Sequence, residues 1–275
     1  MPDDEGPVRG AVAAGAGVTA FARRYGPWAL VAGGSEGIGA AFARALAERG
    51  LDLILVARRA APLARLAALL PTRTVTIATD LAGDEAVPAL MRATTGREVG
   101  LVVANAAYAP TGAFLATDRQ SSLRALSLNC RTPVLLAHQF LPAMVARGCG
   151  GLIVVSSLAG MQGSPGLATY AATKAFGTVL AEGLWGELRG SGVDVLACVA
   201  GAVATPDLAK AKPGRAPGTV TPDVVAAAAL RALGRRPRSV PGGVARVASA
   251  VMSRLVPRSV AIRVMGNASR DLSPG

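Results

Sequence analysis

Short aliphatic runs alternate with amphipathic stretches along the 275-residue chain, and this alternation constrains the fold more than any other feature. Runs with the length of buried strands lie at 28–32, 51–57, 74–78, 101–104, 152–155, 193–199 and 239–240. Stretches with helical spacing lie at 38–49, 62–70, 84–95, 118–147, 169–189 and 223–233. Because strands that are apolar on both faces need cover on both sides, the pattern predicts an α/β fold. We expect a doubly wound parallel sheet of about seven strands with helices on both faces.

The two ends of the chain depart from this alternation. Residues 1–20 are small and polar, which predicts a flexible N-terminal extension before a single domain at 21–275. Residues 242–266 carry an apolar stripe at roughly helical spacing, interrupted by Arg246 and Arg254. We expect them to form a C-terminal helical extension packed on the domain. A helix on a membrane surface is the alternative, so peripheral membrane contact through this segment stays open.

The net charge of +12 belongs mostly to the last quarter of the chain. Residues 207–275 contain 12 Lys and Arg against 3 Asp and Glu. A basic surface of this kind attracts an anionic substrate, a lipid surface or nucleic acid, and a solvated basic face fits equally well. The basic charge is the only feature of the sequence that favours nucleic acid. We therefore expect no nucleic-acid partner.

Cysteine usage and hydropathy predict a cytoplasmic protein. No apolar run approaches the ~20 residues that a membrane-spanning helix needs, and the acidic start of the chain is unlike a signal peptide. Cys130, Cys149 and Cys198 are widely spaced and form no metal-binding pattern, so we expect free thiols and no metal.

A glycine-rich turn follows the first predicted strand, where the chain reads Gly33-Gly34-Ser35-Glu36-Gly37-Ile38-Gly39 before a helix. Glycines let the backbone approach a pyrophosphate, and the N-terminus of a helix favours its negative charge. The position after the first strand of a βαβ unit indicates a dinucleotide site, with a plain tight turn as the alternative.

The end of the second predicted strand distinguishes NAD from NADP. An enzyme that uses NAD usually has a carboxylate there for the ribose 2′-hydroxyl. This chain has Arg58 and Arg59 instead, while Asp52 lies at the opposite end of the strand. Two arginines are suited to a 2′-phosphate, so NADPH/NADP+ is the expected cofactor. An ordinary basic helix start is the alternative.

Tyr170 and Lys174 are four residues apart on a predicted helix and therefore share one face. Ser157 lies thirteen residues before Tyr170, at the carboxyl end of the fifth predicted strand. Ligands of open α/β sheets bind at that end of the strands. The combination favours a catalytic site over a chance surface pair.

With these motifs in place, the sequence resembles the short-chain dehydrogenase/reductase family over about 25–206, with NADP preference and similarity to fatty-acyl and hydroxysteroid ketoreductases. The resemblance implies a Rossmann fold and a catalytic tetrad of Asn129, Ser157, Tyr170 and Lys174. It implies cofactor contacts at Gly33, Ser35, Gly37, Ile38, Gly39, Arg58, Arg59, Asp80, Leu81, Asn105, Ala106, Tyr170, Lys174, Val203 and Thr205. Departures from the family pattern are Ala32, Ala107 and Ala200, and Glu36 where some NADP-using members are basic.

The resemblance also implies a reaction. Ser157 would hydrogen-bond a substrate carbonyl and Tyr170 would donate the proton. Lys174 would hold the ribose and lower the pKa of Tyr170, and Asn129 would position a water. We therefore expect an oxidoreductase that reduces a ketone to a secondary alcohol, or catalyses the reverse oxidation. A catalytically weak nucleotide-binding scaffold, or a basic binder of lipid or nucleic-acid surfaces, is the alternative.

The substrate side is mostly apolar, with Tyr108, Met161, Gln162 and Leu167 as expected lining residues. This lining suggests a hydrophobic carbonyl compound of the polyketide, steroid or 3-oxoacyl type. A basic loop containing Lys210, Lys212 and Arg215 is expected beside it. We also expect a homo-oligomer, either a dimer or a tetramer.

Overall fold

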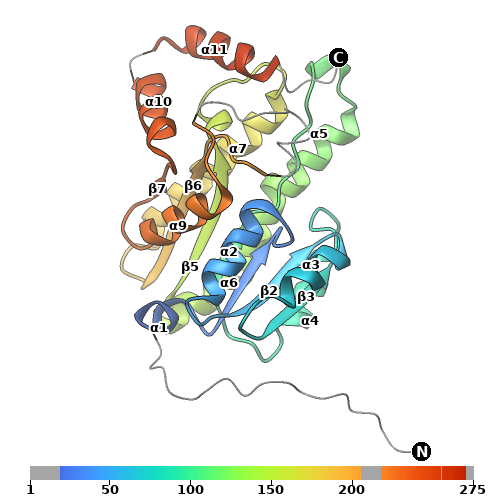
Figure 1. Ribbon diagram of the computed structural model, residues 1–275, viewed down its shortest axis with the longest axis vertical. Helices are drawn as coiled ribbons and strands as arrows, with labels where there is room; N and C mark the ends of the chain where they lie inside the picture. Colours follow the sequence, from blue (N-terminus) through green and yellow to red (C-terminus); the bar gives the residue numbers. More distant parts are fainter. Residues whose placement is uncertain (1–18, 206–217, 255, 271–275) are drawn as a thin grey trace, which may run out of the picture.

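The computed structural model describes residues 19–205, 218–254 and 256–270. Its centre is one seven-stranded sheet in the order β3-β2-β1-β4-β5-β6-β7, with every neighbouring pair parallel. The strands are β1 (Trp28–Ala32), β2 (Asp52–Ala57), β3 (Thr74–Ala78), β4 (Val99–Ala104), β5 (Gly150–Ser157), β6 (Val193–Ala200) and β7 (Arg238–Ser239). The predicted doubly wound fold is confirmed (Figure 1).

Helices cover both faces because successive strand residues point to opposite sides of the sheet. Ala29 and Val31 of β1 pack in a core with α2 (Gly37–Ala47), α3 (Ala60–Ala67) and α9 (Pro222–Ala232). The other residues of β1 pack in a second core with α4 (Ala86–Thr94), α6 (Thr132–Arg147) and α7 (Ala168–Glu187). Aliphatic side chains dominate both cores.

The helix expected over 118–147 is interrupted. It consists of α5 (Arg119–Leu126), a π-helical turn η2 (Ser127–Arg131) and α6. The Thr132 hydroxyl donates to the carbonyl oxygens of Ser127 and Leu81, at 3.2 and 2.8 Å. Periodicity in the sequence does not reveal a single wider turn, although such turns are common at functional sites.

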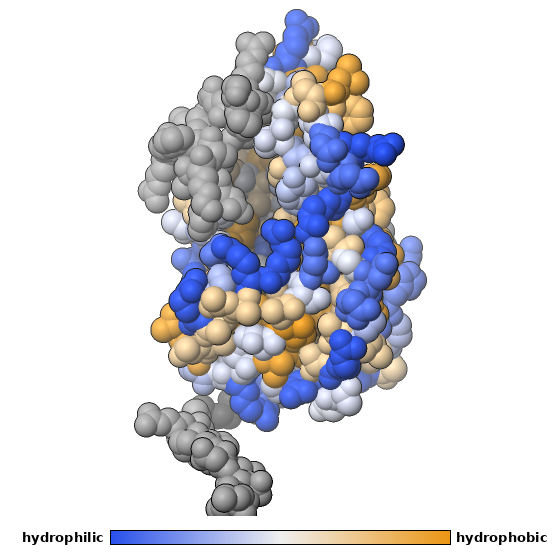
Figure 2. All heavy atoms as spheres, turned by 90° about the vertical axis from the view of Figure 1, so that its right-hand side faces the viewer, coloured by the Kyte–Doolittle hydropathy of each residue, from blue (hydrophilic) through white to orange (hydrophobic). Residues whose placement is uncertain are grey.

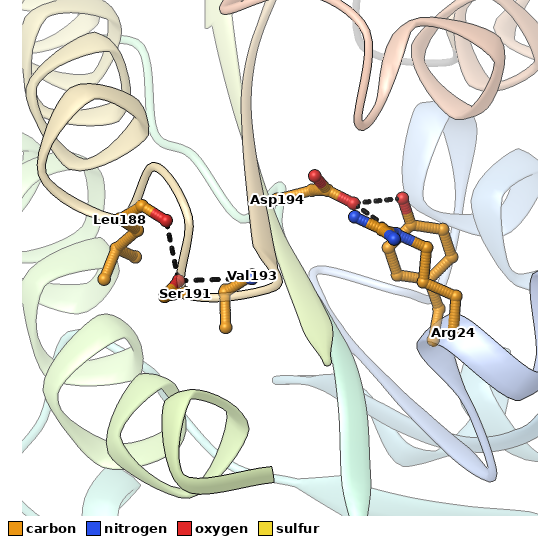
Figure 3. Close-up of polar contacts among 6 residues, drawn as sticks. Arg24, Leu188, Ser191, Val193 and Asp194 are labelled. Atoms are coloured by element: carbon orange, nitrogen blue, oxygen red, sulfur yellow. Dashed lines mark hydrogen bonds and ion pairs between the residues drawn. The ribbon is translucent and has the colours of Figure 1, made fainter. Parts of the chain in front are cut away.

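The short helix α1 (Ala20–Tyr25) precedes the sheet and begins inside the stretch expected as an extension. Thr19 caps it, because its hydroxyl oxygen accepts a 3.0 Å hydrogen bond from the amide of Ala22. Arg24 and Tyr25 then reach Asp194 at the start of β6. Arg24 Nε and the Tyr25 hydroxyl each donate to Asp194 Oδ2 at 2.6 Å (Figure 3). This cluster ties the helix to the amino end of the sheet.

The turn before β6 is held by Ser191 (Figure 3). Its hydroxyl donates to the carbonyl of Leu188 at 2.6 Å and accepts from the amide of Val193 at 3.2 Å. Asp194 therefore follows a turn that is fixed by local hydrogen bonds.

The C-terminal segment forms two helices, α10 (Gly243–Arg254) and α11 (Arg258–Arg270), where one stripe over 242–266 was expected. Pro257 lies between them and cannot continue a helix. Both helices lie at the end of the molecule opposite α1 (Figure 1). Helix α10 contacts the short 3₁₀ helix η3 (Leu158–Met161) that follows β5, and Ser249 Oγ donates to Met161 Sδ at 3.0 Å.

Candidate active site

The glycine-rich turn lies between the end of β1 and the start of α2. Gly33 and Gly37 have φ angles of 79° and 55°, in the left-handed region that glycine adopts without strain. A Cβ atom at Gly39 would lie 1.9 Å from the carbonyl oxygen of Gly33, so only glycine fits there. The turn therefore presents bare backbone beside the N-terminus of α2, where a phosphate is favoured.

The ends of β4 and β6 close around this turn. Asn105 Nδ2 donates a 2.9 Å hydrogen bond to the carbonyl oxygen of Gly33. A Cβ at Gly33 would lie 2.7 Å from Cα of Ala106, and one at Gly37 would lie 3.1 Å from the Thr205 methyl. These close approaches form a backbone cradle that fits a dinucleotide.

Other residues expected at the cofactor lie around the cradle. Ser35 and Ile38 are half-buried, and Ile38 packs against the core. Val203 is buried and pairs with Val220 in an isolated β-bridge. Leu81 is buried in the core that also contains Leu90 of α4 and Leu136 of α6.

Arg58 and Arg59 are both exposed just beyond β2. Arg59 Nη2 forms a 2.6 Å ion pair with Glu36 Oε2 in the glycine-rich turn. Within the described part of the chain, no hydrogen bond or ion pair involves Arg58. The acidic departure from the family pattern thus neutralises one arginine and leaves the other available to a 2′-phosphate.

Asp80 follows β3 and is held by α5. Its Oδ2 accepts a 2.7 Å hydrogen bond from Arg124 Nη2, and its Oδ1 accepts from the amide of Ala82 at 3.1 Å. Partial burial acts to raise the pKa of Asp80, but these hydrogen bonds and the Arg124 charge outweigh it, so the pKa is lowered. Asp80 and Arg124 line an open hollow of about 420 Å³.

The serine, tyrosine and lysine expected to be catalytic come together at the carboxyl end of β5. Ser157 is its last residue, and its hydroxyl accepts a 3.2 Å hydrogen bond from the amide of Ala159. It also lies near enough to Tyr170 on α7 to act on the pKa of that phenol. Lys174, one turn further along α7, lies with Nζ 5.7 Å from the centroid of the Tyr170 ring. Its ammonium is buried and donates a 2.9 Å hydrogen bond to the carbonyl of Val155.

The electrostatics of the tyrosine differ from the expectation. Burial raises the pKa of Tyr170, and the hydrogen bond from Ser157 acts in the opposite direction without cancelling it. The expected lowering by Lys174 does not dominate, because the ammonium bonds Val155 instead of the phenol. Burial also lowers the pKa of Lys174 to about 8, so this side chain still carries its charge at neutral pH.

Asn129, the fourth expected catalytic residue, lies buried in the π-helical turn η2. Its Nδ2 donates to the carbonyl of Tyr108 and to Thr173 Oγ1, at 2.8 and 2.9 Å, and its Oδ1 accepts from the amide of Tyr108 at 2.8 Å. The side chain is therefore occupied in joining the loop after β4 to α7. A water held by Asn129 would have to use its backbone.

Comparison with known proteins identifies this arrangement. The family model described as short chain dehydrogenase matches residues 27–216, more than half of the chain. The chain belongs to the short-chain dehydrogenase family. It is therefore an oxidoreductase, and the resemblance inferred from the motifs is confirmed.

This short-chain dehydrogenase is similar in sequence to two curated relatives of different named activity. The 7beta-hydroxysteroid dehydrogenase of Clostridium sardiniense is 34% identical over 197 residues, covering 70% of this chain and 76% of the relative. The very-long-chain 3-oxoacyl-CoA reductase of Laccaria bicolor is 34% identical over 189 residues, covering 66% of this chain and 56% of the relative. The chain thus spans little more than half the length of the second.

Solved structures give the same family. A structure from work on 7beta-hydroxysteroid dehydrogenase stereoselectivity has a TM-score of 0.84 at 27% identity, covering 89% of this chain and 98% of that one. A short-chain dehydrogenase from Sphingobium yanoikuyae in complex with NADPH has a TM-score of 0.70 at 31% identity, covering 78% of this chain and 87% of that one.

Sequence reasoning missed residues that support this dehydrogenase's site. Ser156 is buried, and its hydroxyl donates to the carbonyl of Lys174 at 2.6 Å while accepting from Thr178 at 2.7 Å. A Cβ at Gly160 would lie 2.5 Å from the amide nitrogen of Ala175, so glycine lets η3 touch α7. The only feature of the sequence that pointed to Ser156 was that a second small polar residue stands directly before Ser157.

The expected substrate-lining residues occupy two segments. Leu167 is buried before α7, and Gln162 Nε2 donates to the carbonyl of Leu158 at 3.5 Å. Met161 faces α10, whereas the Tyr108 hydroxyl lies 3.4 Å from Ser121 Oγ on α5. The basic loop at 210–215 lies outside the described residues.

Figure 2 shows the side of α3 and α5, where hydrophilic residues cross the middle of the surface beside a recess.

Two further searches concern metals and membranes. Across 19–205, 218–254 and 256–270, no cluster of three His, Cys, Asp or Glu side chains is placed to hold a metal ion. In the same ranges, no helix has both the length and the apolarity to span a membrane.

Proposed function

We propose that this short-chain dehydrogenase uses NADPH to reduce a ketone on a hydrophobic substrate to a secondary alcohol, or catalyses the reverse oxidation. The observation that carries the proposal is the grouping of Ser157 at the end of β5 with Tyr170 and Lys174 on α7, at the same end of the sheet as the glycine cradle. A nucleotide-binding scaffold without turnover would not require these three side chains together.

Each side chain has a defined task in this reaction. The Ser157 hydroxyl donates a hydrogen bond to the substrate carbonyl oxygen. The Tyr170 hydroxyl gives its proton to the same oxygen as that oxygen gains charge, and the raised pKa keeps this proton in place at neutral pH. The charged Lys174 stabilises the resulting phenolate. The phenolate then takes one proton back from solvent, which restores the Tyr170 hydroxyl for the next turnover.

The cofactor site fits NADPH. When bound, NADPH supplies the hydride that reaches the carbonyl carbon. The cradle of Gly33, Gly37 and Gly39 would hold its pyrophosphate. Arg58 would hold the 2′-phosphate, with Arg59 beside it in its ion pair with Glu36. The NADPH complex of the Sphingobium relative supports this choice.

The substrate class follows from the relatives and the apolar lining. Relatives named as hydroxysteroid dehydrogenase and 3-oxoacyl-CoA reductase act on a steroid and a long acyl chain. We expect Met161 and Leu167, which lie between Ser157 and Tyr170 in the sequence, to offer apolar contact to the substrate. We expect a steroid, polyketide or 3-oxoacyl ketone.

A screen of such ketones with purified protein tests the proposal. Oxidation of NADPH is followed by its absorbance, with NADH as the matched alternative cofactor and the Tyr170→Phe variant as the background control. Ketone-dependent oxidation of NADPH that the variant lacks supports the proposal. Tight NADPH binding without turnover on any ketone class would favour the scaffold.

The wider setting is part of the same proposal. We place the protein in the cytoplasm, where its three free cysteines stay reduced, and treat 21–275 as one domain with 242–266 packed on it. Exposed apolar side chains on α5 and α7, namely Leu123, Leu126, Phe176 and Val179, support a homo-oligomer. Light scattering of the Phe176→Asp variant, compared with the unmodified protein, tests this assembly.

A further inference from the structure

Helix α10 exposes an apolar stripe on its outer side. Val244, Val247 and Val251 are 65%, 65% and 40% exposed, and their spacing places them along one side of the helix. Ala245 and Ser249 are buried on the opposite side. A helix on the surface of a domain normally turns its polar side to water, so this stripe requires a partner.

Helix α11 repeats the arrangement. Val260 and Val264 are 38% and 48% exposed, whereas Ala261 is buried. Ile262 packs on the loop after η3, because a Cβ at Gly163 would lie 3.4 Å from its Cγ1. Both helices are therefore held to the domain by one side and carry exposed valines on the other.

The charged residues of the segment that contains these valines have a single sign. Residues 224–270 contain nine arginines and no Asp, Glu or Lys. Arg246, Arg258 and Arg263 of the two helices are exposed. By contrast, the exposed apolar groups of α7 share their helix with Glu182 and Glu187. Helices α10 and α11 thus combine exposed valines with arginines, and their own sequences contain no acidic residue.

We propose that α10 and α11 bind the surface of an anionic lipid bilayer. The valines would enter the boundary between headgroups and acyl chains, and the arginines would lie along it with their guanidinium groups at the lipid phosphates. A second copy of this surface is a poor partner, because it would place arginines against arginines.

The position of this surface gives the contact a use. Helix α10 touches Met161 through Ser249, and α11 touches Gly163 through Ile262, so both border the segment after Ser157. A bilayer here would present a dissolved hydrophobic ketone beside the active site. This use rests on the proposed function, but lipid binding itself does not.

Vesicle flotation of the full chain tests the proposal, without NADPH or ketone so that its outcome is independent of turnover. The probes are vesicles of phosphatidylcholine alone and of phosphatidylcholine mixed with phosphatidylglycerol, at low and high salt. The double variant Val244→Asp/Val247→Asp removes the stripe, and Leu69→Asp is its control because Leu69 is 81% exposed elsewhere. Arg263→Gln is matched by Arg92→Gln, an exposed arginine on α4.

We expect binding to the anionic vesicles only, weakened by salt. The valine variant should lose it, and Arg263→Gln should weaken it about fivefold, since each arginine near such a surface contributes about that factor. Both controls should bind normally, and all variants should melt with the unmodified protein. Equal binding by the valine variant, or a dimer that this variant abolishes without any vesicle binding, would overturn the proposal.

Discussion

Two tyrosines occupy opposite ends of the parallel sheet, and only one of them is placed for chemistry. Tyr25 lies at the amino end, where its hydroxyl donates to Asp194, which also accepts from Arg24. Tyr170 lies at the carboxyl end near Ser157, and Lys174 Nζ is 5.7 Å from the centroid of its ring. Burial is the main cause that raises the pKa of both tyrosines above the ordinary value.

The difference lies in the partners. Asp194 fixes the Tyr25 proton and is itself neutralised by Arg24, so the charges of this cluster compensate each other. Lys174 has no carboxylate partner in the described residues, and its ammonium bonds only the carbonyl of Val155. A perturbed pKa therefore does not identify a catalytic residue by itself. An unpaired charge beside an exchangeable proton does so better.

Replacing Tyr170 by Phe should give the largest effect on activity. The change removes the proton donor and keeps the ring, so kcat should fall roughly 10²–10⁴-fold. NADPH binding and melting temperature should stay close to those of the unmodified protein. Steady-state kinetics with fluorescence titration of NADPH measures both, and substantial remaining turnover would mean that another group supplies the proton.

The buried Lys174 should make stability rise with pH. Its folded pKa of about 8 lies below the ordinary value of 10.5, so its stabilising contribution is complete above 10.5 and is lost as pH falls through 8. Relative to a Lys174→Met variant, the free energy of unfolding should gain up to about 3 kcal/mol over this interval. Urea unfolding across the range measures it, and parallel curves for the two proteins would contradict the assignment.

The same Phe substitution at Tyr25 should have the opposite consequence. It removes a hydrogen bond to a carboxylate, so stability should fall by about 1.5–3 kcal/mol while kcat stays unchanged. Because burial raises the pKa of Tyr25, its contribution is complete below about pH 10 and declines above that pH. Urea unfolding and steady-state kinetics on the same preparation of Tyr25→Phe measure both quantities. A loss of kcat with normal stability would show that Tyr25, like Tyr170, serves the reaction.

A smaller effect should come from replacing Glu36, which forms an ion pair with Arg59. This pair lies at the carboxyl end of the sheet, whereas the pair of Asp194 and Arg24 lies at the amino end. The side chains of Glu36 and Arg59 are both well exposed, so Glu36→Gln should change the free energy of unfolding by less than about 1 kcal/mol. Freeing Arg59 should tighten NADPH binding up to about fivefold and leave NADH unchanged. Titration with both cofactors measures this, with Arg58→Gln as the variant that should weaken NADPH. If Glu36→Gln changed the affinities for NADPH and NADH equally, Arg59 would not bind the 2′-phosphate.

The sequence by itself determined the strands, most helices and the spacing of the catalytic residues. Strand β1 and strand β3 have the predicted bounds, because buried parallel strands are continuous apolar runs. Ser157 could be placed at a strand end, and Tyr170 and Lys174 on one helical face, because these relations depend on local periodicity alone.

Only the tertiary structure decided which charges are compensated. Glu36 and Arg59 are 23 residues apart, Asp80 and Arg124 are 44 apart, and Tyr25 and Asp194 are 169 apart. No local pattern links such positions, because their contact depends on how the layers pack. The raised pKa of Tyr170 likewise follows from its burial in the folded chain, which the order of residues does not display.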